Sequence, residues 1–309
     1  MKRVLVTGAT GCVGRHALPV LLEHGWEVHA VTSRQVPDDV PDRVTWHRAN
    51  LLDREQRNAA VERAGASHLL HLAWFLAPGK WAAASENFDW LEASVALVRA
   101  FRRGGGQRVV TAGSCLEYDW AYGYCSEART PCAPQTAYGT CKHALQMLTT
   151  ALAADGTMSS AWGRIFFVYG PYEHPDRLVA SVIRSLLAGE PARCTHGNQI
   201  RDYLFAADVA EAFVALLESR VSGPVNIASG RAVALKDIVE RIGTLLGKPE
   251  LIRLGAIPAA ATDTPLVVGD TTRLHASLDW RPRYELEAGL QRTIAWWQEH
   301  LLATETQHA

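Results

Sequence analysis

The 309-residue sequence lacks several features that would assign it to a particular class of protein. No apolar run approaches the roughly 18 residues of a membrane span, and the residues after Met1 contain no charged region, apolar region and cleavage site. Neither charge predominates, since 31 Lys and Arg stand against 32 Asp and Glu. These absences predict a cytoplasmic protein whose partners are small molecules or copies of itself, and neither nucleic acid nor a membrane.

Cysteine pairing is absent as well. The sequence has no CxxC pair and no His/Cys spacing typical of a zinc site, so we expect no metal. Cysteines that are scattered in a cytoplasmic chain are expected to stay reduced. We therefore predict six free thiols: Cys12, Cys115, Cys125, Cys132, Cys141 and Cys194.

The first half of the chain alternates short β-branched apolar segments with segments of helical spacing. Strands are predicted at residues 2–7, 26–32, 44–47, 67–73 and 108–112, and helices at 13–25, 54–64 and 88–103. Crossover helices between strands require a parallel sheet covered on both faces. The pattern predicts an α/β fold with a Rossmann-type doubly wound parallel sheet.

The second half of the chain is less regular. The pattern predicts helices at 137–154, 178–187, 209–217 and 235–246, and strands at 160–168 and 224–228. We expect a dinucleotide-binding domain at 1–163 and a smaller, mainly substrate-binding α/β domain at 164–301. Some elements of the second half, such as 203–217, are expected to return to the main sheet. Residues 302–309 are expected to form a solvated tail.

The first chemical motif is GATGCVG at residues 8–14, between the first strand and the first helix. Gly8 permits a tight turn, Gly11 lets the backbone approach a pyrophosphate, and Gly14 lets the helix pack on the strand. The free N–H groups of the helix N-terminus attract phosphate. We predict that a dinucleotide binds through Gly8, Thr10, Gly11, Cys12, Val13 and Gly14.

The end of the second strand bears on the choice of cofactor. NAD-specific sites usually have an acidic residue there, whereas this sequence has Ser33 and Arg34, which suit a 2′-phosphate. We predict NADP, with NAD as the alternative if Arg34 is only a solvated loop residue. After the third strand, Asn50 and Leu51 are candidates to meet the adenine, and Asp53 is expected to cap the next helix.

The second chemical motif is YGTCK, with Tyr138 and Lys142 four residues apart on one face of a helix. An ammonium beside the phenol is expected to lower the pKa of Tyr138 and make its proton transferable. Gly139 is unfavourable in a helix unless another element approaches closely. Ser114, at the end of a parallel strand, faces the crevice where ligands bind.

Together these segments resemble the extended short-chain dehydrogenase/reductases, and within them the nucleotide-sugar epimerases, dehydratases and reductases. The resemblance covers nearly the whole chain and includes VTGATGCVG at 6–14, HLA at 71–73, GRIFFVYGP at 163–171 and RDYLFAADVAEAF at 201–213. It implies a catalytic triad in which Tyr138 is the acid/base, Ser114 bonds the reacting oxygen and Lys142 bonds the nicotinamide ribose. It also implies that Leu72, Ala73, Trp74, Phe166 and Val168 line the cofactor.

The resemblance implies a nucleotide-diphosphate sugar as substrate. Arg201 matches the arginine that holds the diphosphate, the alternative being an ion pair with Asp202 or Asp208. Cys115, Glu117, Phe167 and Arg177 are the other expected substrate contacts, although Cys115 also suits a place in the core. A homodimer through the helices that begin near 88 and 137 is implied too.

Departures from the family pattern narrow the activity. The 4,6-dehydratases have Thr-Asp-Glu where this chain has Ser114-Cys115-Leu116, so dehydration is not expected. The cysteine of related epimerase-reductases is shifted by one residue, and Phe167 replaces a usual asparagine. The leading hypothesis is an NAD(P)-dependent reductase of a nucleotide-activated keto-sugar, with a 4-keto-6-deoxy hexose as the sugar. The alternatives are a 4-epimerase that retains NAD and a non-catalytic regulator that binds NADP.

Overall fold

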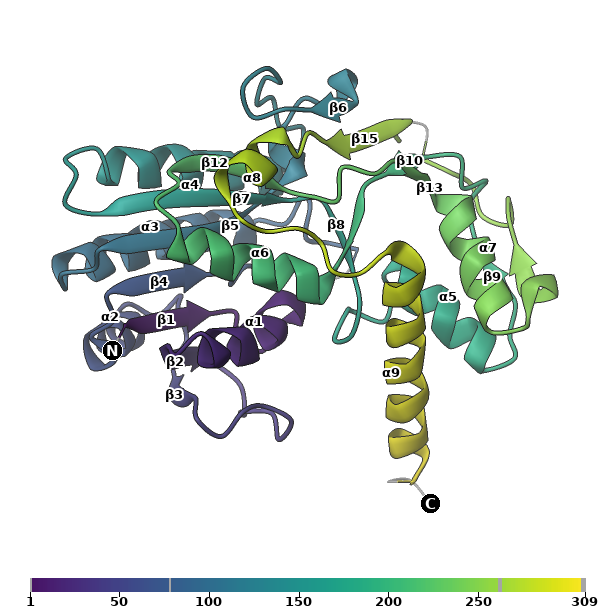
Figure 1. The fold of residues 1–309 in the computed structure, drawn as a ribbon, viewed down its shortest axis with the longest axis horizontal. Coiled ribbons are helices and arrows are strands. Elements are labelled where there is room, and N and C mark those ends of the chain that lie inside the picture. Colours follow the sequence, from purple (N-terminus) through teal and green to yellow (C-terminus); the bar gives the residue numbers. More distant parts are fainter. Residues whose placement is uncertain (1, 78, 261–262, 307–309) are drawn as a thin grey trace.

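A seven-stranded parallel sheet forms the centre of the structure (Figure 1). The computed structural model describes residues 2–77, 79–260 and 263–306, with side chains up to Leu301. The strands lie in the order β12-β7-β5-β4-β1-β2-β3, and each neighbouring pair is parallel. Their bounds are β1 Arg3–Thr7, β2 Glu27–Thr32, β3 Thr45–Arg48, β4 His68–His71, β5 Arg108–Ser114, β7 Ser159–Ile165 and β12 Gly223–Ile227. The predicted Rossmann-type doubly wound sheet is confirmed.

The order of the strands changes direction between β1 and β4. From β1 the chain builds β2 and β3 on one side, and then crosses to β4 and β5 on the other. In doubly wound sheets, ligands bind beyond the carboxyl ends of the strands at such a reversal. The reversal therefore marks the edge of the sheet at which the glycine-rich turn follows β1 and Ser114 ends β5.

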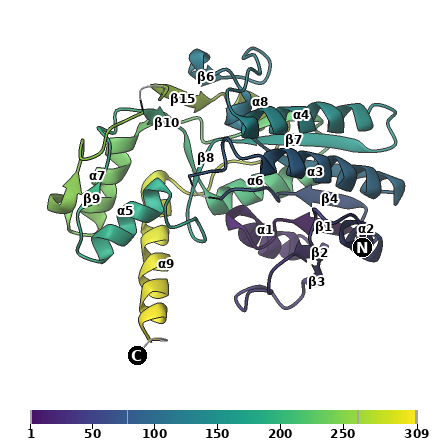
Figure 2. The ribbon, with the colours of Figure 1, turned by 180° about the vertical axis from the view of Figure 1, so that it is seen from behind.

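Both faces of the sheet are covered by helices because the central strands have consecutive apolar residues, whose side chains point alternately to one face and to the other. In β1, Val4 and Val6 belong to the core under α1 (Cys12–Glu23) and α6 (Ala206–Glu218), while Leu5 belongs to the core under the other helices. Those are α2 (Arg54–Ala64) and α3 (Glu86–Arg103), with α4 (Ala137–Leu152) packed beside α3. α1 and α6 lie in front of the sheet in Figure 1, and α3 and α4 in Figure 2.

A second group of elements lies beyond the carboxyl edge of the sheet and has its own apolar core. Its helices are α5 (Leu178–Leu187), α7 (Leu235–Leu245) and α9 (Leu286–Thr306), and α8 (Thr272–Ser277) packs near β12. Among the described residues, short strands form three smaller sheets outside the main one: β6 Tyr124–Cys125, β8 Phe167–Tyr169, β9 Ala192–Arg193, β10 Ile200–Arg201, β11 Tyr203–Phe205, β13 Val233–Ala234, β14 Ile252–Arg253 and β15 Leu266–Gly269. The 3₁₀ turns are η1 Cys115–Glu117, η2 Trp120–Tyr122 and η3 Pro249–Leu251.

The strand predicted at 160–168 is two strands, so that prediction is wrong. β7 ends at Ile165, and β8 pairs with β11 outside the main sheet. The break occurs because the Phe166 N–H donates to Ile227 and the Phe167 N–H donates to Asp202. α6 and β12 come from the second half of the sequence yet belong to the main sheet and its cover. The division of domains at residue 163 stays a prediction.

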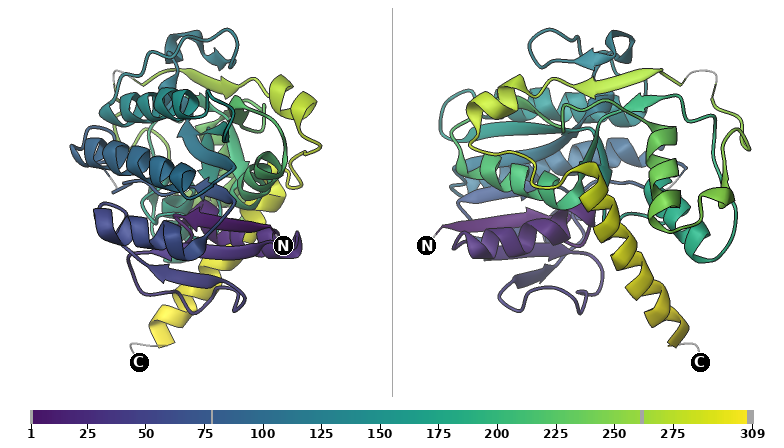
Figure 3. Two further views of the ribbon diagram at one scale, coloured as in Figure 1. Left: turned by 90° about the vertical axis from the view of Figure 1, so that its left-hand side faces the viewer. Right: turned by 45° about the vertical axis from the view of Figure 1, so that its right-hand side comes forward.

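The sequence pattern assigned no helix to the end of the chain, but α9 runs away from the sheet to Thr306 (Figure 3). The first five residues of the predicted tail therefore continue this helix, and residues 307–309 lie outside the described residues. Even α9, at 21 residues, is not apolar enough to cross a membrane, and the same holds for every other described helix.

Candidate active site

The glycine-rich turn joins β1 to α1 at the carboxyl edge of the sheet. Gly8 has a φ of +71°, and a Cβ there would lie 2.6 Å from the Ala73 nitrogen at the end of β4. A Cβ on Gly14 would overlap the carbonyl oxygen of Gly8, so only glycine lets α1 approach the turn this closely. No side chain caps the first turn of α1, and no acidic residue lies in it. Its N–H groups therefore remain available, and the turn fits the pyrophosphate of a dinucleotide.

Ser114 and Tyr138 are brought together by the contact of α4 with η1. The Thr136 hydroxyl accepts a hydrogen bond from the Gly139 N–H at 3.0 Å and begins α4. At Gly139 an added Cβ would overlap the carbonyl oxygen of Leu116, which confirms the expected close approach. As a result the Tyr138 side chain is hydrogen-bonded to that of Ser114.

Lys142 lies one helical turn further along α4 and is buried. Its Nζ donates a hydrogen bond to the Ala112 carbonyl at 2.8 Å and lies 4.0 Å from the centre of the Trp74 ring. Burial lowers the pKa of Lys142 to about 7. The three side chains that the motif predicted are therefore neighbours at the carboxyl end of β5.

The pKa of Tyr138 moves in the direction opposite to the expected one. Burial raises this pKa well above its usual range, and the hydrogen bond with Ser114 opposes the rise. The expectation failed because Lys142 points to the Ala112 carbonyl, with Nζ 5.8 Å from the centre of the Tyr138 ring. The phenol is therefore protonated at neutral pH, which is the form that donates a proton.

Two tryptophans pack against Tyr138. Trp81 lies edge-on to the phenol with 5.0 Å between ring centres, and Trp74 does so at 6.2 Å. The Trp74 indole N–H donates to the Asn87 side chain at 2.8 Å. Arg177, which is exposed, lies 5.5 Å from the Trp81 ring and thus on the Trp81 side of Tyr138. The surroundings of Tyr138 are therefore aromatic, with one cation at the rim.

Glu117 and Cys115 do not face a ligand, which corrects their predicted role as substrate contacts. Glu117 is fully buried and accepts from the Arg164 guanidinium at 2.9 Å, the Trp162 indole N–H at 2.8 Å and the Ser114 N–H at 2.7 Å. Its oxygens are therefore occupied within the protein. Cys115 is 1% exposed and lies in the core beside Tyr118 and Phe166. A place in the core was the alternative prediction for this residue.

Arg201 is buried, and its Nη2 forms an ion pair with Asp263 Oδ1 at 2.6 Å. The alternative partners considered for it are wrong, because Asp202 accepts from the backbone N–H groups of Ser229, Gly230 and Gly269. Asp208 accepts from the backbone N–H of Arg283 and Tyr284. The Phe167 ring lies 5.5 Å from the Arg201 guanidinium, so these two predicted substrate residues are neighbours.

The remaining predicted cofactor residues lie at or near the carboxyl ends of the strands. Ser33 and Arg34 are exposed after β2, and the Arg34 N–H donates to the Thr32 hydroxyl at 3.1 Å. Asn50 is exposed and accepts from the Leu52 N–H, whereas Leu51 is buried. Asp53 caps α2, as expected. Leu72, Ala73 and Trp74 follow β4. Phe166 is buried in the apolar cluster that also contains Cys115, and Val168 packs against the core under α1 and α6.

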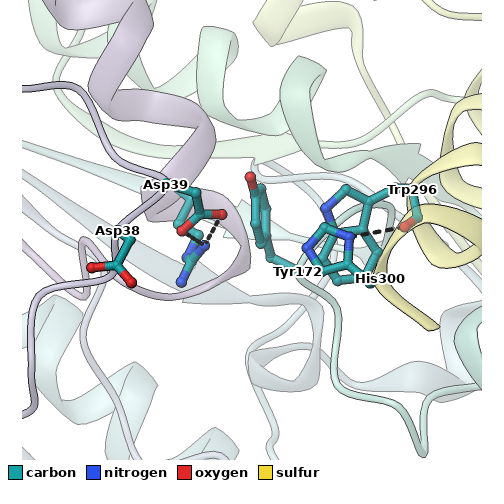
Figure 4. Close-up of a pocket in the computed structure, with 6 residues that line it drawn as sticks. Asp38, Asp39, Tyr172, Trp296 and His300 are labelled. Atoms are coloured by element: carbon teal, nitrogen blue, oxygen red, sulfur yellow. Dashed lines mark hydrogen bonds and ion pairs between the residues drawn. The ribbon is translucent and has the colours of Figure 1, made fainter. Parts of the chain in front are cut away.

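The sequence reasoning missed two residues in the turn after β8. Tyr172 has a φ of 66°, a left-handed backbone that is costly for a residue with a side chain. Its ring stacks at 4.4 Å with the Arg15 guanidinium, which is paired with Asp39, and meets Trp296 of α9 at 5.2 Å. These residues line a cavity of about 480 Å³ together with Asp38 and His300 (Figure 4). No local pattern reveals a left-handed tyrosine.

Glu173, the next residue, is the second one missed. It is 8% exposed, and its Oε2 atom is buried without a hydrogen-bond partner. Burial raises the pKa of Glu173 to about 8, which the positive charge of Arg177 opposes. The only available signal was an acidic residue in the short turn after an apolar strand that ends at the ligand-binding edge.

Comparisons with known proteins agree with this arrangement. Residues 4–228 match the model of the NAD dependent epimerase/dehydratase family. The UDP-glucose 4-epimerase of Corynebacterium glutamicum is 25% identical over 311 residues, which cover 91% of either chain. The dTDP-4-dehydro-6-deoxy-D-allose reductase of Streptomyces bikiniensis is 25% identical over 335 residues, which cover 97% of either chain. The solved structure of MoeE5 in complex with UDP-glucose and NAD is 31% identical, with a TM-score of 0.83, covering 97% of this chain and 99% of that one.

Proposed function

The chain belongs to the NAD dependent epimerase/dehydratase family of nucleotide-sugar-modifying enzymes, and we propose that within it the protein reduces a nucleotide-activated keto-sugar. The sugar we propose is a 4-keto-6-deoxy hexose. The observation that carries this proposal is the contact of a protonated Tyr138 with Ser114 at the carboxyl end of β5. Cys115 and Leu116 follow Ser114, so no carboxylate stands where a dehydratase would place its acid and base.

The proposed reaction needs a hydride and a proton. A dinucleotide held at the glycine-rich turn would supply the hydride from C4 of its nicotinamide ring. Tyr138 donates its phenolic proton to the carbonyl oxygen of the sugar, while the Ser114 hydroxyl donates a hydrogen bond to the same oxygen. Lys142, whose Nζ donates to the Ala112 carbonyl, is proposed to bond the nicotinamide ribose, and solvent returns a proton to the phenolate of Tyr138. The carbonyl thus gains two electrons and two hydrogens and becomes an alcohol.

The substrate side of the site is proposed to bind a nucleotide diphosphate. Arg201 and Arg177 are the cations on that side. The Phe167 ring, against the Arg201 guanidinium, is proposed to give an apolar surface for the substrate. Arg201 reaches the diphosphate only when it exchanges its partner Asp263 for a phosphoryl group, since the guanidinium is otherwise covered. MoeE5 has been solved with UDP-glucose, which supports a nucleotide-diphosphate sugar as the class of substrate.

NADP is the proposed cofactor, with NAD as the alternative. No carboxylate ends β2 to accept the ribose hydroxyls, and the Arg34 side chain is exposed at this end of the sheet. NAD is the dinucleotide in the MoeE5 complex, which supports the alternative. The two cofactors differ by one phosphate, so the proposal depends on the charge at Arg34.

A 4-epimerase is the second candidate, supported by the similarity to the UDP-glucose 4-epimerase of C. glutamicum. An epimerase uses Ser114, Tyr138 and Lys142 twice and must retain its dinucleotide between the two half-reactions. The deciding experiment is to denature the purified protein, identify any released nucleotide, and then supply NADPH with a 4-keto nucleotide sugar. An empty protein that consumes NADPH supports the reductase. Retained NAD and interconversion of 4-hydroxy epimers support the epimerase, and binding without either reaction supports a regulator.

We also propose a homodimer formed through α3 and α4. Phe88 of α3 is 58% exposed, and Met147 and Leu148 of α4 are 53% and 44% exposed, which is unusual for large apolar side chains on packed helices. Light scattering at micromolar concentration should give twice the mass of 33.8 kDa. A monomeric mass contradicts the dimer.

We also propose that the protein acts in the cytoplasm. All six cysteines are free thiols, as expected for a protein in a reducing compartment.

A further inference from the structure

Glu173 occupies a place that no step of the proposed reaction uses. It follows the left-handed Tyr172, whose ring is held by Arg15 on α1 and by Trp296 on α9. Figure 4 shows Tyr172 between Asp39 on one side and Trp296 and His300 on the other. A strained backbone persists only where its surroundings impose it. The contacts of Tyr172 therefore hold the turn in the conformation that buries Glu173.

The turn that carries Glu173 contacts the N-terminus of α1. The thiol of Cys12, the first residue of α1, donates to the carbonyl of Pro171 at 3.4 Å, two residues before Glu173. The negative charge of Glu173 also raises the pKa of the Cys12 thiol. The N-terminus of α1 is the part of the glycine-rich turn that receives a pyrophosphate. A carboxyl group and a phosphoryl group would therefore be neighbours here.

Apart from a hydrogen bond from the Gly170 backbone, the groups that face Glu173 compensate its negative charge only weakly. Arg177 is the cation on its side, but its exposed guanidinium lies over Trp81. Tyr203 of β11 and Cys12 of α1 have pKa values raised by burial, so both stay neutral. His16, near Pro171, has a lowered pKa and is neutral too, while Arg15 is paired with Asp39. An anionic Glu173 beside a pyrophosphate would therefore be repelled strongly.

We propose that Glu173 links dinucleotide binding to proton uptake: as a neutral acid it donates a hydrogen bond to a phosphoryl oxygen beside Cys12, and as a carboxylate it repels that oxygen. The unpartnered Oε2 is the atom that acquires the bond. The inference rests on dinucleotide binding at the glycine-rich turn and not on the reductase activity. No covalent bond changes. When the dinucleotide binds at a pH above the pKa that Glu173 has in the nucleotide-free chain, a proton moves from solvent to Glu173.

The test measures affinity for NADH, and in a parallel series for NADPH, by calorimetry on the full chain freed of nucleotide. Because the pKa of Glu173 is about 8, binding to the wild-type chain should weaken about tenfold between roughly pH 7 and pH 9. NADH has no group that titrates in this interval, so the loss reports on the protein. Titration at about pH 9 in two buffers of different ionisation enthalpy should show uptake of close to one proton for each dinucleotide bound.

The decisive variant is Glu173→Gln, which keeps the shape and a donor but cannot ionise. Its affinity should match that of the wild-type chain at low pH and should lack the Glu173 part of the loss between about pH 7 and about pH 9, so that only the titration of Lys142, with a pKa of about 7, remains. Glu211→Gln is the matched control, because Glu211 of α6 also has a raised pKa but lies by the far end of α1, near Glu23 and His24. This control should retain the tenfold loss.

The outcomes separate the two proposals. A wild-type chain that binds NADH with the same affinity across the interval overturns the linkage but leaves the cofactor assignment intact. A Glu173→Gln chain that keeps the wild-type pH dependence also overturns the linkage. A chain that binds neither dinucleotide at any pH overturns both. The circular dichroism and melting temperature of each variant must match those of the wild-type chain for the affinities to be compared.

Discussion

The turns after β5 and after β8 each bury a glutamate, but only one of the two is paired. Glu117, in the turn after β5, accepts hydrogen bonds from Arg164, Trp162 and Ser114. Glu173, in the turn after β8, has an oxygen without a partner. The first carboxylate belongs to the scaffold that holds Ser114, and the second is left to interact with something else.

The contrast shows that burial alone does not identify a functional carboxyl group. A buried charge that is fully hydrogen-bonded is part of the framework, and removing one partner leaves the other unsatisfied. A buried acid without a partner is kept neutral and can change its charge when a ligand arrives. The two turns should therefore respond differently to substitution, and the following experiments test that difference.

The largest effect is expected at Tyr138, the proposed proton donor, beside the turn after β5. Replacing Tyr138 by Phe removes the proton donor while leaving the packing of Trp81 in place, so turnover should fall on the order of a thousandfold. Dinucleotide affinity should change less than about twofold, measured by calorimetry. Tyr122→Phe is the control, since Tyr122 is exposed and should turn over normally. Normal turnover by Tyr138→Phe would remove this residue from the mechanism.

The next effect is on stability in the same turn. Glu117→Gln leaves Arg164 buried without its counter-ion, which should lower the free energy of unfolding by about 3–5 kcal/mol. Denaturant unfolding with an unchanged m-value measures the loss. The control, Glu211→Gln, breaks the pair with the exposed Arg283 and should cost less than about 1 kcal/mol. Equal losses in both variants would show that the Glu117 pair is not part of the framework.

At the β8 turn the expected effect depends on pH. Glu173 has its pKa raised to about 8 in the folded chain, so the folded chain binds a proton that the unfolded chain has already released. The contribution of Glu173 to the free energy of unfolding should therefore fall as pH rises, on the order of 1 kcal/mol per unit between about pH 5.5 and about pH 7.5. Urea unfolding of Glu173→Gln should lack this component. If the wild-type and Glu173→Gln chains lose stability in parallel, the acid is not buried in its neutral form.

A smaller effect is expected where α4 meets η1. An alanine at Gly139 would push its Cβ into the carbonyl of Leu116, which should destabilise the chain by about 1–2 kcal/mol after the better helix propensity of alanine is counted. Turnover should fall as well, because Tyr138 moves relative to Ser114. Thr140→Ala, at an exposed site in the same helical turn, should be neutral or stabilising. Full activity and stability of Gly139→Ala would show that the approach tolerates a methyl group.

The smallest effect is expected beyond both turns, at the end of β2. Arg34→Ala should weaken NADPH binding by up to about fivefold, because an exposed charge contributes at most about 1 kcal/mol. NADH binding should not change, since NADH lacks the 2′-phosphate. Arg43→Ala, exposed in the same loop, controls for general charge. Equal weakening of both dinucleotides would assign Arg34 a role other than reading that phosphate.

Sequence spacing was sufficient for the main sheet and for the close backbone contacts at glycines. Alternation of strands and helices predicted the parallel sheet, and GATGCVG predicted the turn in which Gly8 and Gly14 have no room for a side chain. The position of Gly139 indicated a close contact before its partner was known. These features follow from local periodicity and backbone sterics, which a single sequence displays directly.

Only the tertiary structure decided which side chains meet. Arg164 reaches Glu117 across 47 residues, and Arg201 reaches Asp263 across 62, neither of which periodicity encodes. The raised pKa of Tyr138 follows from burial by segments far away in the chain, and so does the unpaired acid of Glu173. The sequence by itself determined the sheet, the glycine-rich turn and the catalytic helix. Burial and charge pairing at the carboxyl edge were decided by packing, because desolvation depends on every element that surrounds a group.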